Sequence, residues 1–198
     1  MNKFVIGFLL SFSLLLSGCI AEEFIINSEN FESAFNKQNN EQEFNRVTVP
    51  ITSVIDGDTI RVKFEGKEER VRFLLIDTPE MNHGNDEEPQ PFGQDATDFV
   101  KDMLKAGEVE LELDINERDR YGRILAYLYV DGVNVQEELL RNGLARVAYV
   151  FPPNTRYVDE YKAIQQEAQA NEMGIWSVEN YSQEDGFYPE YVTENDED

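Results

Sequence analysis

The sequence predicts an α+β protein, mainly β with helices, built as a five-stranded OB-fold barrel with three helices. The first observation is a set of short apolar or alternating runs at residues 47–55, 59–64 and 69–76, each typical of a strand. The second is an amphipathic helical pattern that follows them. The third is a pair of strand-like runs at residues 109–113 and 124–130, with helices afterwards. A barrel interrupted by a helix after its third strand is the OB-fold plan.

Turn signals separate the first three strands. Asp56-Gly57 follows the first run and predicts a turn or bulge, because glycine accepts a positive φ. Glu65-Gly66-Lys67-Glu68 lies between the second and third runs and predicts a hairpin. In the third run, Val71–Ile76 is apolar except for Arg72, so we expect a strand buried on both faces. Pro79 then starts a loop, since proline has no backbone N–H.

Three helices are predicted in addition to the strands. The first runs from Gly93 to Ala106, where apolar residues recur three and four positions apart, and Gly107 ends it. The second begins at Asn134, with Glu137 three residues later as an N-terminal capping signature, and ends at Gly143. The third is indicated by apolar residues at helical spacing, namely Tyr157, Tyr161, Ile164 and Ala168.

Residues 1–18 are predicted to form a signal peptide. Lys3 precedes the apolar run Phe4–Leu16, which is too short for a comfortable membrane span. The small residues Ser17-Gly18 directly before Cys19 resemble the lipobox of bacterial lipoproteins, which implies cleavage before Cys19 and its lipidation. The alternative is an ordinary secretory signal with an incidental cysteine. Lipidation is favoured because Cys19 is the only cysteine of the chain and has no disulfide partner.

The rest of the chain divides into three predicted segments. Residues 19–45 are expected to be the lipidated cysteine and a flexible acidic linker, with a short amphipathic helix as the less favoured alternative. Residues 46–180 form the barrel domain, and residues 181–198 form an acidic, disordered tail. Two or more acyl chains would anchor the protein to the extracellular face of the cell membrane, from which a protease could shed the domain.

The charge of the chain is unusual for a protein that binds polyanions. It carries 17 Lys and Arg residues against 40 Asp and Glu residues, a formal net charge of −23. Proteins that bind nucleic acid usually have the opposite sign. A site can nevertheless be locally basic inside an acidic molecule, so the charge does not exclude an anionic substrate.

Three motifs follow one another along the predicted domain. They are Asp56-Gly57-Asp58-Thr59, then Arg72-Phe73-Leu74-Leu75-Ile76-Asp77-Thr78-Pro79-Glu80, then Tyr121-Gly122-Arg123. Together they resemble the staphylococcal nuclease (thermonuclease) family, from about Val47 to Trp176. The resemblance implies the same barrel and a Ca²⁺-dependent phosphodiesterase. Such an enzyme cleaves DNA and RNA with little sequence preference and leaves 3′-phosphate ends.

A hard cation is the first chemical expectation. Asp58 follows a turn glycine and Asp77 ends a central strand, so both can project from one mouth of the barrel. Two carboxylates held close together need a positive charge, and oxygen ligands suit Ca²⁺ or Mg²⁺. A solvated turn is the alternative for Asp56-Gly57-Asp58. The resemblance implies Ca²⁺, with Asp58, Asp77 and the backbone carbonyl of Thr78 as ligands.

Five further residues are candidates for catalysis and substrate binding. Glu80 is the candidate general base, with an exposed loop carboxylate as the alternative. Arg72 and Arg123 are expected to hold phosphate, because guanidinium groups match its oxygens. The alternatives are an internal ion pair for Arg72 and a turn residue for Arg123. The resemblance implies that Arg123 also assists the leaving group and that Tyr121 and Tyr149 contact the nucleotide, with half-buried core tyrosines as the alternative.

One segment departs from the family pattern. Relatives carry lysines in the loop after the catalytic glutamate, whereas this chain has Asp86-Glu87-Glu88, which puts its affinity for long DNA in doubt. Arg70, Arg118 and Arg120 lie nearby in the motifs and could compensate. The leading expectation is a monomeric, membrane-tethered nuclease. The alternatives are a non-catalytic OB-fold module that binds nucleic acid or a partner, and an acidic surface lipoprotein that holds Ca²⁺.

Overall fold

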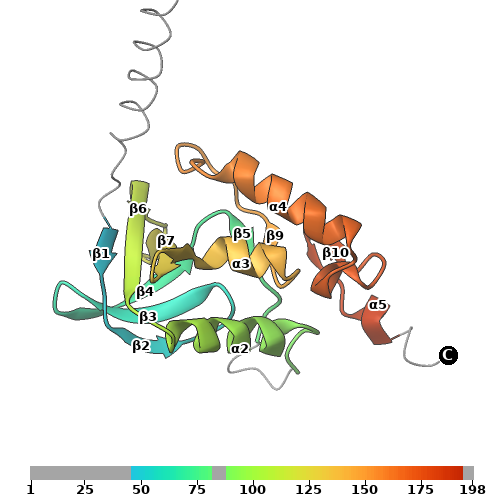
Figure 1. Ribbon diagram of the computed structural model, residues 1–198, viewed down its shortest axis with the longest axis horizontal. Helices are drawn as coiled ribbons and strands as arrows, with labels where there is room; N and C mark the ends of the chain where they lie inside the picture. Colours follow the sequence, from blue (N-terminus) through green and yellow to red (C-terminus); the bar gives the residue numbers. More distant parts are fainter. Residues whose placement is uncertain (1–45, 82–87, 194–198) are drawn as a thin grey trace, which may run out of the picture. The chain divides into compact units, whose positions relative to one another are not determined.

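The computed structural model describes residues 46–81 and 88–193, which lie within one compact unit of the chain, Asn45–Asp198. Figure 1 shows them as a curved sheet with helices packed against it. The predicted signal peptide, Cys19 and the linker lie outside the described residues. Within the described part of the chain, no helix is both long and apolar enough to cross a membrane.

The fold is α+β, as predicted, and its main sheet has seven strands. In spatial order they are β1 (Arg46–Thr48), β6 (Val109–Arg118), β7 (Ile124–Val130), β4 (Lys67–Phe73), β3 (Thr59–Phe64) and β2 (Ile51–Val54), with β8 (Val133–Asn134) paired to β7. Neighbouring strands are antiparallel except β4 and β7, which are parallel. Because β1 and β2 are consecutive in the chain but lie at opposite ends of this order, they close the sheet into a barrel.

The first predicted strand, residues 47–55, is two strands rather than one. Pro50 lies between β1 and β2 and has no backbone N–H to donate to a ladder. The break separates two pairings, because β1 pairs with β6 whereas β2 pairs with β3.

The third predicted strand is also divided. β4 ends at Phe73, and Leu75 takes a left-handed conformation with φ of 66°. The chain then forms β5 (Ile76–Asp77), which pairs with β9 (Arg146–Val147) outside the main sheet. The expected burial of Val71–Ile76 is confirmed, since all six side chains are buried. The expected continuity is wrong, because the turn redirects Asp77 toward a different partner strand.

Three main helices are present near the predicted positions: α2 (Gly93–Leu104), α3 (Val135–Arg141) and α4 (Val158–Ala170), followed by the short 3₁₀ helix η1 (Gly174–Trp176). The Asn134 side chain accepts a hydrogen bond from the Glu137 N–H at 3.1 Å, which confirms the predicted cap. α3 contacts β7, α2 and α4, and lies between the sheet and α4 (Figure 1). The core is the barrel interior together with the facing sides of these helices, including Ile60, Val71, Phe73, Leu111, Leu128, Val100, Leu139 and Leu140.

The expected disorder of residues 181–198 is wrong for residues 181–193. This segment forms a small hairpin of β10 (Ser182–Gln183) and β11 (Gly186–Phe187), then the one-turn helix α5 (Glu190–Thr193). Tyr181 is fully buried, and its ring packs against those of Phe92 and Phe187. The acidic composition suggested disorder, but aromatic burial outweighs it.

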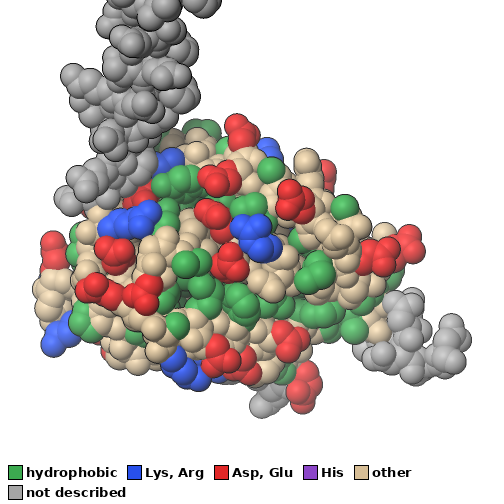
Figure 2. Space-filling view, in the orientation of Figure 1, with side chains coloured by type: hydrophobic (Ala, Val, Ile, Leu, Met, Phe, Trp, Pro, Cys, Tyr) green, Lys and Arg blue, Asp and Glu red, His purple; other side chains and the backbone are tan. Residues whose placement is uncertain are grey.

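On the face seen in Figure 2, acidic side chains do not gather in one patch. Figure 2 shows Asp and Glu side chains scattered across one face of the described residues, with Lys and Arg between them. Several acidic residues are also buried, including Asp58, Asp77, Glu112 and Asp114. The buried carboxylates are the informative ones, because burying a charge is unfavourable unless it is paired.

Candidate active site

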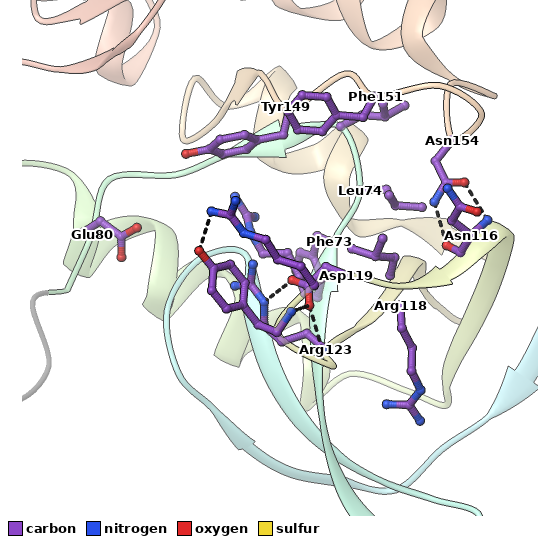
Figure 3. A pocket seen from close by; sticks show the side chains of 15 residues that line it. Phe73, Leu74, Glu80, Asn116, Arg118, Asp119, Arg123, Tyr149, Phe151 and Asn154 are labelled. Carbon is purple, nitrogen blue, oxygen red and sulfur yellow. Dashed lines mark hydrogen bonds and ion pairs between the residues drawn. The ribbon is translucent and has the colours of Figure 1, made fainter.

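A pocket of about 650 Å³ lies where three segments meet: the end of β4, the turn between β6 and β7, and the chain after β9. Figure 3 shows its side chains, with Glu80 on one side and Tyr149 and Phe151 along another. All five residues predicted for catalysis and substrate binding line it, namely Arg72, Glu80, Tyr121, Arg123 and Tyr149. The second and third sequence motifs therefore meet at this pocket, together with Tyr149.

Arg72 joins the pocket to the two predicted aspartates. It lies on β4 and is only 9% exposed. Its Nη1 is 2.5 Å from Asp58 Oδ2, an ion pair without the geometry of a hydrogen bond, and its Nη2 donates to Asp77 Oδ1 at 3.4 Å. Asp58 and Asp77 are not among the described residues that line the pocket, so Arg72 is their link to it. The internal ion pair considered for Arg72 is present, but the same side chain also faces the pocket.

Asp58 and Thr78 are held together by the close approach of two segments. The backbone N–H of Thr78 donates to Asp58 Oδ2 at 3.1 Å, and Thr59 Oγ1 donates to Asp58 Oδ1 at 2.9 Å. A Cβ added at Gly57 would lie 2.8 Å from Thr78 Oγ1, which is too close for two such atoms. The expected reason for this glycine, a positive φ, is wrong, since Gly57 is not among the glycines that have one. Glycine is needed here because a Cβ would collide with Thr78 and, at the same distance of 2.8 Å, with Ala96 Cβ.

The carboxylates of this region destabilise one another. Burial, and then the negative charge of Asp58, raise the pKa of Asp77. The same two causes raise the pKa of Asp56 to about 7, although Asp56 accepts a hydrogen bond from the Asp58 N–H. A local excess of buried negative charge is the environment that a hard cation stabilises.

Asp58 and Asp77 both contact Arg72, and the Thr78 N–H donates to Asp58, so the two carboxylates and the residue that carries the third predicted ligand are neighbours. Oxygen donors of this kind fit a hard cation. Within the described residues, no group of three His, Cys, Asp or Glu side chains has the arrangement of a metal site. The predicted set contains only two such side chains. Its role as a metal site remains a prediction.

Hydrogen bonds fix the backbone of Glu80, whereas its side chain is exposed at the pocket. Its N–H donates to Gln90 Oε1 and its carbonyl accepts from the Gln90 N–H, both at 2.9 Å. A Cβ added at Gly93 would lie 2.8 Å from the Glu80 carbonyl oxygen, so the start of α2 fixes this backbone from the other side. Partial loss of hydration, and then the charges of Asp58 and Asp77, raise the pKa of the Glu80 carboxyl.

Arg123 is oriented by Asp119 within the turn between β6 and β7. Asp119 accepts from the Arg123 Nε at 2.7 Å and from the Arg123 backbone N–H at 2.9 Å. Burial alone would raise the pKa of Asp119, but these hydrogen bonds outweigh it and lower that pKa. In the part of the chain that is described, no hydrogen bond or ion pair engages Nη1 or Nη2 of Arg123. Both remain available to an anion in the pocket.

Aromatic rings border the two arginines. Tyr121 is 63% exposed and Tyr149 is 56% exposed, so neither is a core tyrosine. The Arg72 guanidinium lies 5.3 Å from the centre of the Tyr149 ring, and that of Arg123 lies 5.7 Å from the Tyr121 ring. Phe151 is 69% exposed and its ring is 6.5 Å from that of Tyr149. The pocket thus combines cations for an anionic group with flat apolar rings.

Residues 70–178 of the chain match the family described as staphylococcal nuclease homologue. This stretch covers more than half of the chain and contains Arg72, Asp77, Glu80 and Arg123, while Asp58 lies before it. The chain belongs to the staphylococcal nuclease family. It is therefore an enzyme of the nuclease type, and the resemblance drawn from the motifs is confirmed.

Named relatives of this nuclease agree with the assignment. Endonuclease YncB of Bacillus subtilis (strain 168) is 49% identical over 142 residues, which cover 71% of this chain and 67% of YncB. The SPbeta prophage-derived endonuclease YokF of the same organism is also 49% identical over 142 residues, but the match spans only 48% of YokF. The thermonuclease of Staphylococcus hyicus is 36% identical over 177 residues, covering 89% of this chain and 99% of that protein.

Several residues that shape the site of this nuclease were not predicted from the sequence. Gln90 pairs with Glu80, and Phe151 adds a ring beside Tyr149. Arg146 forms an ion pair with Asp77 at 2.9 Å. The only signal for Arg146 was a single charge in an otherwise apolar run, Leu144–Val150, which resembles the position of Arg72 in its own strand.

Proposed function

We propose that this nuclease is a Ca²⁺-dependent, monomeric endonuclease that hydrolyses phosphodiester bonds in DNA and RNA and leaves 3′-phosphate ends. The observation that carries the proposal is the convergence of Arg72, Arg123 and Glu80 on one pocket, with Asp58 and Asp77 in contact with Arg72. The printed names of the relatives, endonuclease and thermonuclease, support the same reaction class.

The two arginines would bind the scissile phosphate. Arg123 offers its two Nη groups because Asp119 holds only the Nε of the guanidinium. Arg72 is held by ion pairs with Asp58 and Asp77. Both guanidinium groups are thus oriented before substrate arrives. Fixed donors of this kind stabilise the negative charge that develops on phosphate oxygens in the transition state.

Glu80 would act as the general base. Its carboxylate accepts a proton from a water molecule whose oxygen attacks phosphorus, and the bond from phosphorus to the 5′ oxygen breaks. The phosphate then stays on the 3′ side of the cut. A hydrogen bond or proton from Arg123 to the departing 5′ oxygen would complete the step. The raised pKa of Glu80 makes it a stronger proton acceptor than an isolated carboxylate.

Asp58, Asp77 and the Thr78 backbone carbonyl would hold the cation. When bound, Ca²⁺ would supply positive charge beside the phosphate and orient water. The choice of Ca²⁺ rests on oxygen-only donors and on the family resemblance. The exposed rings of Tyr121, Tyr149 and Phe151 would lie against bases or sugars, because every base offers a flat face, and this is consistent with low sequence preference.

Cleavage assays on the full-length chain test this function. We expect it to cut single-stranded DNA, duplex DNA and RNA in Ca²⁺ and to stop when a chelator is added. DNA products should not prime a polymerase until a phosphatase removes the 3′ phosphate. An Arg123→Met protein purified in the same way should be about 10³-fold slower, since a fixed donor is lost. The matched Arg61→Met protein, changed at an exposed position on β3, should cut normally.

Two outcomes of these assays would overturn the proposal. Equal cleavage by the Arg123→Met protein would mean that the activity belongs to a contaminant or uses another site. Binding of nucleic acid without cleavage in Ca²⁺ would favour the non-catalytic OB-fold module. Products that prime directly would refute the proposed cleavage on the 5′ side of phosphorus.

We further propose that the protein acts at the extracellular face of the cell membrane, anchored through Cys19. The support is sequence alone: the apolar run Phe4–Leu16 and the small residues before Cys19. Cells fed a labelled fatty acid should label the wild-type protein and not Cys19→Ser. Protease added to whole cells should remove the wild-type domain. Equal labelling of both proteins, or complete protection from the protease, would contradict the proposal.

A further inference from the structure

Arg146 makes more contacts than an ordinary ion pair requires. It is 6% exposed, and its Nε and Nη2 both donate to Asp77 Oδ2, at 3.2 and 2.9 Å. Its Nη1 donates to the backbone carbonyls of Gln183 and Glu184, at 3.0 and 2.8 Å. The guanidinium also lies 5.3 Å from the centre of the Phe187 ring. One side chain therefore connects Asp77 to the C-terminal hairpin.

These contacts leave the two oxygens of Asp77 in different situations. Oδ2 is occupied by the fork of Arg146, whereas Oδ1 is the oxygen that faces Nη2 of Arg72. Arg72 in turn contacts Asp58. Arg146 thus fixes the rotation of the Asp77 carboxylate so that Oδ1 points to the side where Asp58 lies. The pairing of β5 with β9 sets this arrangement, because Asp77 and Arg146 are cross-strand partners.

The hairpin of β10 and β11 fixes Arg146 from the other side. The backbone carbonyls of Gln183 and Glu184 both accept from Nη1, so this nitrogen needs no hydrogen bond to solvent. The hairpin is itself anchored by Tyr181, which is fully buried, donates its hydroxyl to the Pro91 carbonyl and packs against Phe92. Pro91 directly follows Gln90, the residue that holds Glu80.

We propose that Arg146 is a positioning residue through which the C-terminal hairpin orients Asp77 for cation binding. This inference rests on the proposed function, since it assumes that Asp77 is a ligand. Arg146 does not act on substrate directly, because it is not one of the described residues that line the pocket. Residues that orient a ligand in this way typically change metal affinity by about 10–100-fold when they are lost.

The charge of Arg146 and its orienting role predict opposite changes in cation affinity when Arg146 is replaced. Removing a positive charge beside Asp77 would, by electrostatics alone, strengthen the binding of a cation. Losing the fork that orients Asp77 would weaken it. Arg146→Lys keeps the charge and loses the fork, whereas Arg146→Met loses both. If orientation dominates, both variants bind Ca²⁺ more weakly. If charge dominates, Arg146→Lys resembles the wild type and Arg146→Met binds more tightly.

The measurement is calorimetric titration of the full-length chain with Ca²⁺ alone, without nucleic acid. We expect the Kd for Ca²⁺ to rise by about 10–100-fold in Arg146→Lys. Phe187→Ala keeps both the Arg146 and the Asp77 side chains but removes a ring that packs against the guanidinium and against Tyr181. Arg146 should then be held less firmly, so the Kd should rise by a smaller factor. Arg141→Lys is the matched control, since Arg141 is exposed on α3 and its ion pairs with described residues are to the glutamates of the same helix. It should bind Ca²⁺ as the wild type does.

The outcomes separate this inference from the proposed function. If the wild type binds no Ca²⁺, the calcium requirement fails, and this inference fails with it. If the wild type binds Ca²⁺ and both Arg146→Lys and Phe187→Ala bind equally well, the calcium requirement stands and the positioning role is refuted. Near-ultraviolet circular dichroism in chelator checks that each variant is folded. If Arg146→Lys is not folded, the Kd of Phe187→Ala for Ca²⁺ decides the question.

Discussion

Glu80→Gln is expected to lower kcat for DNA cleavage by about 10²–10⁴-fold, with little change in KM or in stability. The amide has nearly the same shape as the carboxylate but cannot accept the proton of an attacking water. The backbone of residue 80 should stay in place, because Gln90 holds it through two hydrogen bonds that do not involve the Glu80 side chain. The exposed position of the side chain leaves the core untouched.

Single-turnover cleavage of a short labelled DNA measures this effect without interference from product release. Glu160→Gln is the matched control, because it removes the same charge from an exposed site on α4 and should cut as the wild type does. A decrease of less than about tenfold in Glu80→Gln would show that Glu80 is not the proton acceptor. A rise in KM with kcat preserved would instead assign Glu80 to substrate binding.

The residues that could be predicted from sequence are those whose neighbours in the chain determine their place. Asp58 follows a turn, Arg72 lies within a buried run, and Glu80 follows the proline that ends that run. Each position is set by local chemistry, and the ends of central strands meet at one mouth of a barrel. The family motifs then supplied the role expected of each residue. The structure brings these residues together as expected.

The contacts that could not be predicted depend on pairings between distant segments. Arg146 meets Asp77 only because β5 pairs with β9, and β5 exists only because Leu75 turns the chain away from β4. Gln90 meets Glu80 although the two are 10 positions apart in the chain. Neither contact is indicated by any pattern in the residues next to it in the sequence. The same limit explains the error in the tail, where acidic composition concealed the burial of Tyr181.

Glu112 is the second position at which we expect a large effect. Its burial is the opposite of what the alternating pattern of its strand indicates. Its strand places carboxylates at every other position, Glu110, Glu112 and Asp114, which suggests a solvent-facing side. Glu112 is instead fully buried. It accepts from Arg156 Nη1 at 2.6 Å and from the Tyr157 hydroxyl at 2.8 Å, and it pairs with Arg46 Nε at 3.4 Å.

We expect Glu112→Ala to lower the free energy of unfolding by about 3–5 kcal/mol, the usual cost of removing one member of a buried ion pair. The loss arises because the Tyr157 hydroxyl and Nη1 of Arg156 lose the carboxylate that accepts from both of them in a partly buried site. Urea denaturation at neutral pH and fixed salt measures it. Glu117→Ala, on the exposed end of the same strand, should change stability by no more than about 0.5 kcal/mol.

The loss of stability in Glu112→Ala measures how much the Glu112 contacts contribute to holding the chain after β9 against the barrel. This stretch carries Tyr149 and Phe151 at the pocket and is attached to β6 at two places. Asn154 exchanges hydrogen bonds with the backbone of Asn116, at 2.8 and 2.7 Å, and the end of the stretch, Arg156 and Tyr157, donates to Glu112. Arg156 has a second partner in Asp114, at 3.1 Å. A loss below about 1 kcal/mol would mean that this second pair is sufficient and that Glu112 is dispensable. A loss in the expected range would instead make this buried carboxylate the main polar partner for the Arg156–Tyr157 end of the segment, while Asn154 holds the part nearer the substrate-facing rings.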